Sequence, residues 1–343
     1  MIVALGDIHF SSSKDYFVKI SNDVIDWFAG WKHNNSNNEL ILVGDLVQTS
    51  VNAGLVIEFL YRFVAASRFR CVHILKGNHD EKLKDGVWQL AYSFLYHYPN
   101  VKIYTEATIV SIEEKSVLML PYYMAQKQQQ PMAELYSSLY KDKRYQRHFD
   151  LVVGHFADES AAFLSTESVS NLDKLDATTI CLGHVHTRSS NPSRYIGSLF
   201  ANRVNENAND RAAWIIDEAG KREELLPVFC EYIHVRYPDH LPRSRALTPI
   251  YTISNCASEG VARALYGNIF IRKAVQDLAR SDSTLDASEI FLAEADTAAV
   301  FTEFMKSLQP PIDRRVATIC VPLVKNTTKS TDGSNRNPAT TVL

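Results

Sequence analysis

The stretch Leu42-Val43-Gly44-Asp45 shows the pattern that decides the fold of this 343-residue chain: an apolar run, a glycine, and then a side chain that can bind a metal. The pattern recurs at Ala4-Leu5-Gly6-Asp7-Ile8-His9, Leu75-Lys76-Gly77-Asn78-His79-Asp80, Val152-Val153-Gly154-His155 and Cys181-Leu182-Gly183-His184-Val185-His186. Each apolar run is typical of a buried strand, and each glycine permits a sharp turn at the strand's end. We therefore predict strands that deliver Asp, Asn and His side chains at their ends.

Between these segments, residues 1–227 alternate strand-like and helix-like stretches. Apolar residues at helical spacing predict helices at Val18 to Trp31 and Leu55 to Ser67, and another helix is expected near Ala133 to Arg147. Strands are predicted at Glu39 to Val43, Phe69 to Leu75, Val117 to Leu120, Leu151 to Val153, Thr179 to Leu182, Tyr195 to Ser198 and Ala213 to Asp217. The alternation indicates an α/β domain with its ligand site beyond the carboxyl ends of the strands.

The character of the chain changes past Pro227. Strand-like Tyr232 to Val235 and Ile250 to Ile253 precede helix-like Ala262 to Leu278 and Thr297 to Leu308. Residues 228–324 are therefore predicted to form a small α+β domain. Residues 325–343 are rich in Thr, Ser, Asn and Lys with almost no apolar content, which is typical of a disordered tail.

The composition, 46% hydrophobic and 22% charged, is that of an ordinary soluble globular protein. The absence of a long apolar run, of a secretory signal and of paired cysteines predicts a cytoplasmic protein with reduced thiols and no membrane span. A protein that held DNA by bulk electrostatics would be basic, whereas the formal net charge here is −3. A nucleic-acid substrate would therefore have to be attracted by a local patch or by bound metals.

The delivered side chains fit a hydrolytic site in which a carboxylate bridges two divalent cations about 3.5–4 Å apart. Asp45 is the predicted bridge, because it is the only carboxylate of its segment. The other predicted ligands are Asp7, His9 and His186 for one metal and Asn78, His155 and His184 for the other. Oxygen and nitrogen ligands without thiolate favour Mn²⁺, with Mg²⁺, iron or Zn²⁺ as alternatives.

His79 and Asp80 are the candidate catalytic side chains. Two cations lower the pKa of a shared water, which is then expected to attack phosphorus in line with the leaving oxygen. His79 is predicted to protonate or stabilise that leaving oxygen. Asp80 is predicted to orient His79 or to raise its pKa.

The ordered motifs D-x-H, G-D, G-N-H-D, G-H and G-H-x-H resemble those of the calcineurin-like metallophosphoesterase superfamily over roughly residues 1–200. The resemblance implies two mixed β-sheets packed face to face and flanked by helices. It also implies hydrolysis of phosphomonoesters or phosphodiesters with two metals. The ligand roles above, and the role of His79, match the family's pattern position by position.

The segment after Asp45 indicates a branch of that superfamily. Its serine/threonine phosphatases continue with Asp-Arg-Gly, whose arginine clamps phosphate, and its small phosphodiesterases commonly have a second aspartate; both are absent here. Gly44-Asp45-Leu46-Val47 instead is similar to the Gly-Asp-Leu-Phe of SbcD-type recombination nucleases, including phage recombination endonuclease subunits. Further similarity lies in Tyr98 to Tyr104, Pro121-Tyr122, Arg194 to Ser198 and Asp210-Arg211.

Resemblance to this branch implies a DNA exonuclease or endonuclease of recombination, repair or replication, with a capping domain after the nuclease domain. It also implies an SMC-like (SbcC-type) ATPase partner and a homodimer. Leu60, Tyr61, Phe63 and Val64 could form the dimer surface, or their helix could simply cover the sheet. Candidate DNA contacts, which could equally be solvated side chains, are Lys141, Lys143, Arg144, Arg147 and Arg188.

One position departs from the branch. SbcD-type nucleases carry a histidine three residues after the aspartate of the second motif, where it helps to orient the DNA phosphate, and this chain has Gln48 there. Glutamine can donate a hydrogen bond to a phosphate oxygen but cannot carry a positive charge or shuttle a proton. Metal binding is expected to survive, while the balance of exonuclease and endonuclease action stays open. The cleavage polarity, the metal used in the cell and the need for an ATPase partner also stay open.

Two other functions stay open at this point. One is a stand-alone metallophosphatase or small-substrate phosphodiesterase that uses the same site. The other is a non-catalytic scaffold of the same fold. The intact ligand set argues against the scaffold, because a scaffold has no physical need for seven metal donors.

Overall fold

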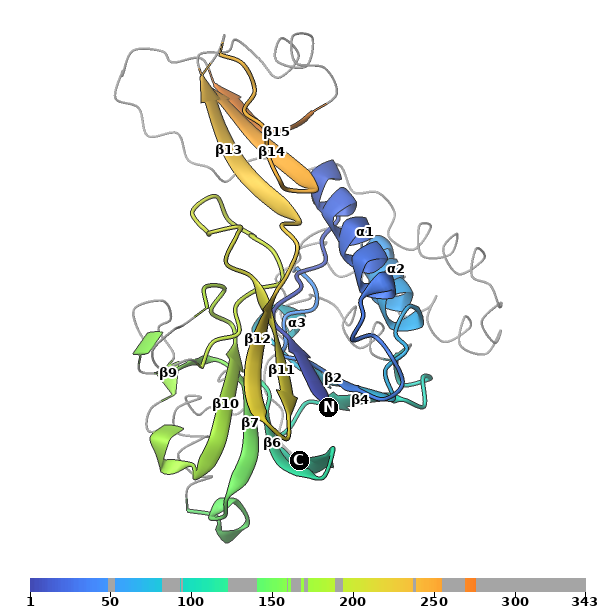
Figure 1. Cartoon of the computed structure of the whole chain (residues 1–343), viewed down its shortest axis with the longest axis vertical. Helices are drawn as coiled ribbons and strands as arrows, with labels where there is room; N and C mark the ends of the chain where they lie inside the picture. The colour runs from blue at the N-terminus through green and yellow to red at the C-terminus, as the bar shows by residue number, and fades with distance from the viewer. Residues whose placement is uncertain are drawn as a thin grey trace, which may run out of the picture.

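The computed structural model describes residues 1–48, 53–81, 93, 95–122, 141–158, 160–161, 168–169, 172–188, 194–236, 239–254 and 269–275. Two β-sheets form its centre (Figure 1). The first contains β1 (Ile2–Leu5), β2 (Glu39–Leu42), β3 (Cys71–Leu75), β4 (Val101–Tyr104), β11 (Ala212–Asp217) and β12 (Gly220–Leu225) in the order β12-β11-β1-β2-β3-β4. The second contains β5 (Thr108–Ile112), β6 (Lys115–Leu120), β7 (Phe149–His155) and β10 (Ala177–Gly183) in the order β10-β7-β6-β5.

Both sheets are mixed. β1 to β4 run parallel to one another. β11 pairs with β1 in the antiparallel direction, and β12 pairs with β11 as the second strand of an antiparallel hairpin. In the second sheet β6, β7 and β10 are parallel and β5 is antiparallel to β6. Short strands β8 (Ala157–Asp158) and β9 (Ser168–Val169) form a separate pair. The predicted α/β fold of two mixed sheets is confirmed.

The core lies between the two sheets and beneath the helices. Alternate residues of a strand point to opposite faces. Ile41 of β2 therefore packs between the sheets with Val153 of β7, while Leu40 and Leu42 pack on the other face beneath the helices. Every residue of β1, β2 and β3 is buried, as the apolar runs predicted.

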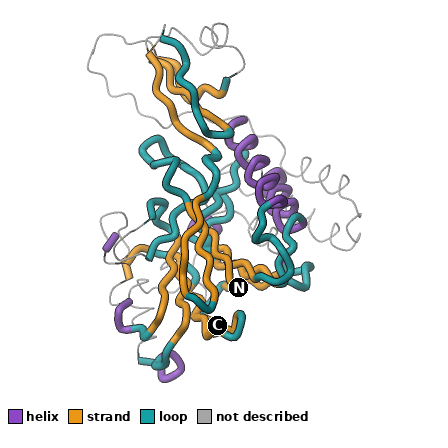
Figure 2. Tube along the Cα trace, viewed as in Figure 1, coloured by secondary structure: helices purple, strands orange, loops and turns teal. Residues whose placement is uncertain are grey.

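Helices α1 (Asp15–Gly30) and α2 (Ala53–Ala65) lie side by side on the outer face of the six-stranded sheet (Figure 2). In α1 the buried side chains of Tyr16, Ile20, Val24 and Phe28 recur every four residues and so form one apolar face. Phe28 stacks on Phe63 of α2 with ring centroids 4.0 Å apart. α3 (Asn78–Glu81) is a single turn that follows β3.

Past Pro227, strands β13 (Cys230–Arg236), β14 (Thr248–Ser254) and β15 (Phe270–Val275) form a parallel three-stranded sheet at one end of α1 (Figure 1). The predicted strands at Tyr232 to Val235 and Ile250 to Ile253 fall within β13 and β14. Thr248 donates a 2.8 Å hydrogen bond to Asp23 of α1. The division into residues 1–227 and 228–324 stays a prediction. Residues 276–343 lie outside the described residues, and they include the expected helix at Thr297 to Leu308 and the expected disordered tail.

Three predicted elements are wrong over their described residues. The helix expected at Ala262 to Leu278 is strand β15 from Phe270, because pairing with β14 overrides its helical spacing. The helix expected to reach Arg147 is only a 3₁₀ turn over Lys143–Tyr145, since Asp142 accepts a hydrogen bond from the Arg144 backbone N–H. Tyr195 to Ser198 makes one isolated bridge and no strand, because Gly197 has a φ of 78°.

Among the described helices none is long and apolar enough to cross a lipid bilayer. The described cysteines Cys71, Cys181 and Cys230 are buried free thiols.

Candidate metal centre

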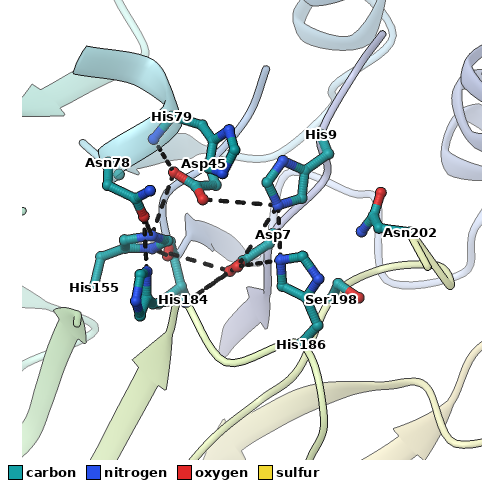
Figure 3. Close-up of polar contacts among 12 residues, drawn as sticks. Asp7, His9, Asp45, Asn78, His79, His155, His184, His186, Ser198 and Asn202 are labelled. Carbon is teal, nitrogen blue, oxygen red and sulfur yellow. Dashed lines mark hydrogen bonds and ion pairs between the residues drawn. The ribbon is translucent and has the colours of Figure 1, made fainter. Parts of the chain in front are cut away.

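The carboxyl ends of parallel strands from both sheets meet at one point. β1, β2 and β3 are parallel neighbours, so the residues that follow them emerge at the same edge of the six-stranded sheet. β7 and β10 are parallel neighbours in the other sheet, where His155 pairs with Gly183. The structure thus brings together all seven predicted metal ligands, Asp7, His9, Asp45, Asn78, His155, His184 and His186 (Figure 3).

One group of donors consists of Asp7, His9 and His186. The Nε2 atoms of His9 and His186 are 2.9 Å apart and point to the same place. Asp7 Oδ2 lies 3.6 Å from His186 Nε2 and 3.9 Å from His9 Nε2. All three side chains lie close enough to hold one cation between them.

A second group surrounds the Asn78 side chain. Asn78 Oδ1 lies 2.7 Å from His184 Nδ1 and 3.1 Å from His155 Nε2. His155 Nδ1 donates a 2.6 Å hydrogen bond to the carbonyl oxygen of Val43. That bond fixes the ring so that Nε2 faces the centre, as an outer partner of a metal-binding histidine commonly does.

Asp45 lies between the two groups. Its Oδ2 is 3.7 Å from His9 Nε2, and its Oδ1 is 3.3 Å from His155 Nε2. The backbone N–H of His79 donates a 2.8 Å hydrogen bond to Oδ1 as well. A carboxylate with one oxygen toward each group has the position that a bridging ligand needs.

The backbone is strained where it delivers these side chains. His9, Asp45 and His184 have φ values of 52°, 48° and 76°, and they make up three of the five described non-glycine residues with positive φ. Such conformations cost about 1–3 kcal/mol each and persist where the surroundings enforce them. Gly44, with a φ of 89°, precedes Asp45, and a Cβ at this glycine would collide with the His155 ring.

Burial and charge determine the protonation of the centre. Burial raises the pKa of Asp7 to about 6, with the charge of His155 opposing the rise. Burial disfavours the charged form of His155, but the carboxylates of Asp45 and Asp7 raise its pKa to about 10. Burial and the charge of His155 lower the pKa of His184 to about 3, so the neutral ring keeps one nitrogen with an available lone pair at neutral pH.

This donor set fits divalent cations. Two fully buried carboxylates attract positive charge to a point that is shielded from water, and imidazole nitrogens and an amide oxygen complete the surroundings. The described donors are oxygen and nitrogen only, which suits Mn²⁺, Mg²⁺, iron or zinc.

The two predicted catalytic residues have different surroundings. His79 lines a cavity of about 210 Å³ at the centre, and its ring centroid is 4.9 Å from that of His9. The buried Asp80 carboxylate accepts backbone hydrogen bonds from Leu46 at 2.9 Å and from Gly77 at 2.8 Å. Asp80 therefore ties together the loops that follow β2 and β3, while an effect of Asp80 on His79 stays a prediction.

Gln48 is half-buried and is not among the described residues that line this cavity. Its backbone N–H donates a 2.9 Å hydrogen bond to Phe10. A role of its side chain in orienting phosphate stays a prediction.

One carboxylate that supports the centre lies outside the predicted motifs. Glu206 Oε1 lies 2.9 Å from His186 Nδ1, and Glu206 Oε2 lies 2.9 Å from Nη2 of the buried Arg211. Arg211 also donates a 2.8 Å hydrogen bond to Ser198 Oγ. Glu206 is in a loop 20 residues after His186 without a motif around it, so no local pattern could have identified it.

Comparison with known proteins agrees with this geometry. The model of the calcineurin-like phosphoesterase family matches residues 1–188. Among solved structures, a protein of unknown function from Aquifex aeolicus is similar, with 18% identity, 50% of this chain and 88% of that chain covered, and a TM-score of 0.29. A TM-score that low carries no conclusion about fold or function, and no curated protein matches the chain. Because the family match spans more than half of the 343 residues and includes all seven converging donors, the chain belongs to the calcineurin-like phosphoesterase family.

Proposed function

We propose that this phosphoesterase is a metal-dependent DNA phosphodiesterase, the nuclease subunit of an SbcCD-like recombination and repair complex. The observation that carries the proposal is the segment after Asp45. Leu46 and Val47 are 1% and 0% exposed and belong to the core beneath the helices, so this strand end supplies no cationic clamp for a phosphomonoester dianion. The absence of that clamp favours a diester, which carries a single negative charge.

The chain's own residues would divide the work as follows. Asp45 would hold two cations, with Asp7, His9 and His186 on one side and Asn78, His155 and His184 on the other. Two bound divalent cations, with Mn²⁺ favoured, supply Lewis acidity and lower the pKa of a water near them. His79 lies at the cavity beside His9, where it would donate a proton to the leaving oxygen.

The predicted DNA contacts need revision in this proposal. Arg188 forms ion pairs with Asp210 and with Glu223, which lies 2.8 Å away, so little of its charge is available. Lys143 and its basic neighbours precede β7, and His155 is the last residue of that strand. The seven residues of β7 span about 20 Å between these basic residues and His155. The three-stranded sheet past Pro227 exposes His234, Arg236 and Arg272, which supports a DNA-binding role for that sheet.

The partners remain part of the proposal. Leu60, Phe63 and Val64 of α2 are 2%, 1% and 5% exposed and pack in this chain's own core. Only Tyr61 of the four candidate dimer residues is partly exposed, so a homodimer through α2 would need other side chains as well. An SMC-like ATPase partner is proposed from the resemblance to the nuclease branch alone.

The function is tested by incubating the protein with Mn²⁺ and labelled linear duplex DNA, single-stranded DNA or a generic aryl phosphodiester, with and without a candidate ATPase partner. We expect Mn²⁺-dependent cleavage of DNA. Hydrolysis of the aryl ester without cleavage of either DNA would favour a stand-alone small-substrate phosphodiesterase. Absence of all hydrolysis would favour the scaffold.

Two variants test the site itself. Asp45→Asn removes the charge between the two donor groups, and His184→Ala removes a donor beside Asn78. Both should abolish Mn²⁺-dependent cleavage while circular dichroism shows a retained fold. Full activity in either variant would contradict the two-metal site.

A further inference from the structure

The cavity at the metal centre contains one arginine that the family motifs do not include. The volume of the cavity is about 210 Å³, and its lining includes Asp45, Asn78, His79, His186, Arg203 and Glu206. The histidines come from the strand ends, whereas Arg203 comes from the loop that joins the centre to β11. The Arg203 side chain is exposed, so a molecule in the cavity can reach it.

Arg203 differs from the neighbouring arginines in its charge balance. Arg188, Arg194 and Arg211 each form an ion pair with a carboxylate, at 2.8, 2.9 and 2.9 Å. Arg203 has no ion-pair partner within the described part of the chain. A guanidinium that has no carboxylate partner, on a residue that lines a cavity, is available for an anion, which it can bind through two parallel hydrogen bonds.

The backbone of Arg203 is held in place by the metal centre itself. The Glu206 backbone N–H donates a 3.1 Å hydrogen bond to the Arg203 carbonyl oxygen and so closes a tight turn. The Glu206 carboxylate accepts hydrogen bonds from the Asn202 backbone N–H and from Arg211 and contacts His186, each at 2.9 Å. The carboxylate is therefore fully used by these three groups, and the turn that carries Arg203 is fixed relative to His186.

We propose that Arg203 binds a non-bridging oxygen of the substrate phosphate at the metal centre. The inference rests on the proposed function, because it specifies how the same site holds its phosphodiester. One guanidinium matches the single negative charge of a diester. Arg203 would reach the phosphate from the loop before β11. The segment after Asp45 contributes no cation, and its residues Leu46 and Val47 are buried.

The test compares the unaltered protein with Arg203→Ala and Arg203→Lys. Arg222→Ala is the matched control, because Arg222 is an exposed arginine on β12 whose side chain approaches Met1, far from the cavity lining. Inorganic phosphate is titrated by calorimetry in the presence of Mn²⁺, and KM and kcat are measured with bis(4-nitrophenyl) phosphate. Mn²⁺ affinity and urea unfolding are measured for every variant.

We expect Arg203→Ala to weaken phosphate binding and raise KM by about tenfold or more, the typical effect of one charge-assisted hydrogen bond. Values for kcat, Mn²⁺ affinity and unfolding should stay close to those of the unaltered protein, and Arg203→Lys should be intermediate. Equal phosphate binding by Arg203→Ala and the unaltered protein, or no phosphate binding by either, would overturn the inference. A protein that binds phosphate through Arg203 but hydrolyses no diester would instead contradict the proposed function.

Discussion

Replacing Glu206 by alanine would test how the loop before β11 supports the metal centre. The substitution removes three contacts of 2.9 Å, with His186 Nδ1, Arg211 Nη2 and the Asn202 backbone N–H. Arg211 is 2% exposed, so its charge would stay buried without a carboxylate. Removing one partner of a buried ion pair costs about 3–5 kcal/mol. Because Arg211 keeps Ser198 and the His186 carbonyl as acceptors, we expect the free energy of unfolding to fall by about 3 kcal/mol.

The same substitution should weaken metal binding. His186 loses the carboxylate that orients its ring, and loss of such an outer partner typically lowers metal affinity about 10–100-fold. Glu206→Gln should be intermediate, because an amide can accept one of these hydrogen bonds but lacks the charge that balances Arg211.

Urea unfolding followed by circular dichroism and calorimetric titration of Mn²⁺ would measure the two effects. Glu223→Ala is the control, since Glu223 pairs with Arg188 at a partly exposed site and Arg188 keeps Asp210. That change should cost less than about 1 kcal/mol. The reasoning is refuted if Glu206→Ala unfolds like the control and binds Mn²⁺ as tightly as the unaltered protein.

Three further perturbations have defined outcomes. Gly44→Ala should destabilise the fold by more than about 1 kcal/mol and abolish Mn²⁺-dependent hydrolysis. Alanine is strained at a φ of 89°, and its Cβ would collide with the His155 ring. Unchanged urea unfolding would count against this packing. Burial opposes ionisation of Glu224, but hydrogen bonds from Lys32 and its neighbours lower the pKa of this carboxyl from 4.5 to about 2. The ionised Glu224 therefore stabilises the fold above pH 4.5, and this stabilisation is lost as the pH falls toward 2. Glu224→Gln should therefore be less stable than the unaltered protein at pH 6 and equal to it near pH 2, and thermal unfolding curves that differ equally at both pH values would exclude this linkage. Gln48→His should raise exonuclease turnover on labelled linear duplex DNA if this glutamine is the attenuating departure, whereas unchanged turnover would remove Gln48 from the mechanism.

The sequence predicted most of the fold because its signals are local. An apolar run that ends in glycine, as at Val43-Gly44, identifies a buried strand and the turn after it without knowledge of the rest of the chain. Parallel pairing then brings strand ends to one edge, so Asp45 and Asn78 could be expected to meet. Strand β15 was missed because it depends on pairing with β14, and its sequence from Phe270 also fits a helix.

The supporting residues of the site could not be predicted for a related reason. Glu206 and Arg211 act through contacts with His186 that depend on how an irregular loop folds back. Arg203 lines the cavity from a turn that is closed by the hydrogen bond of the Glu206 backbone N–H to the Arg203 carbonyl oxygen. In contrast, Arg188 is a candidate DNA contact in the sequence because it is basic. Its ion pairs with Asp210 and Glu223 depend on the folded structure and could not be predicted from the sequence.

The central claim is that two divalent cations bind where the strand ends of both sheets meet. Anomalous diffraction at the manganese absorption edge, from crystals of the protein grown with Mn²⁺, tests it directly. We predict two peaks about 3.5–4 Å apart, one beside Asp7, His9 and His186 and one beside Asn78, His155 and His184, with Asp45 between them. A single peak, or peaks away from Asp45, would contradict the claim.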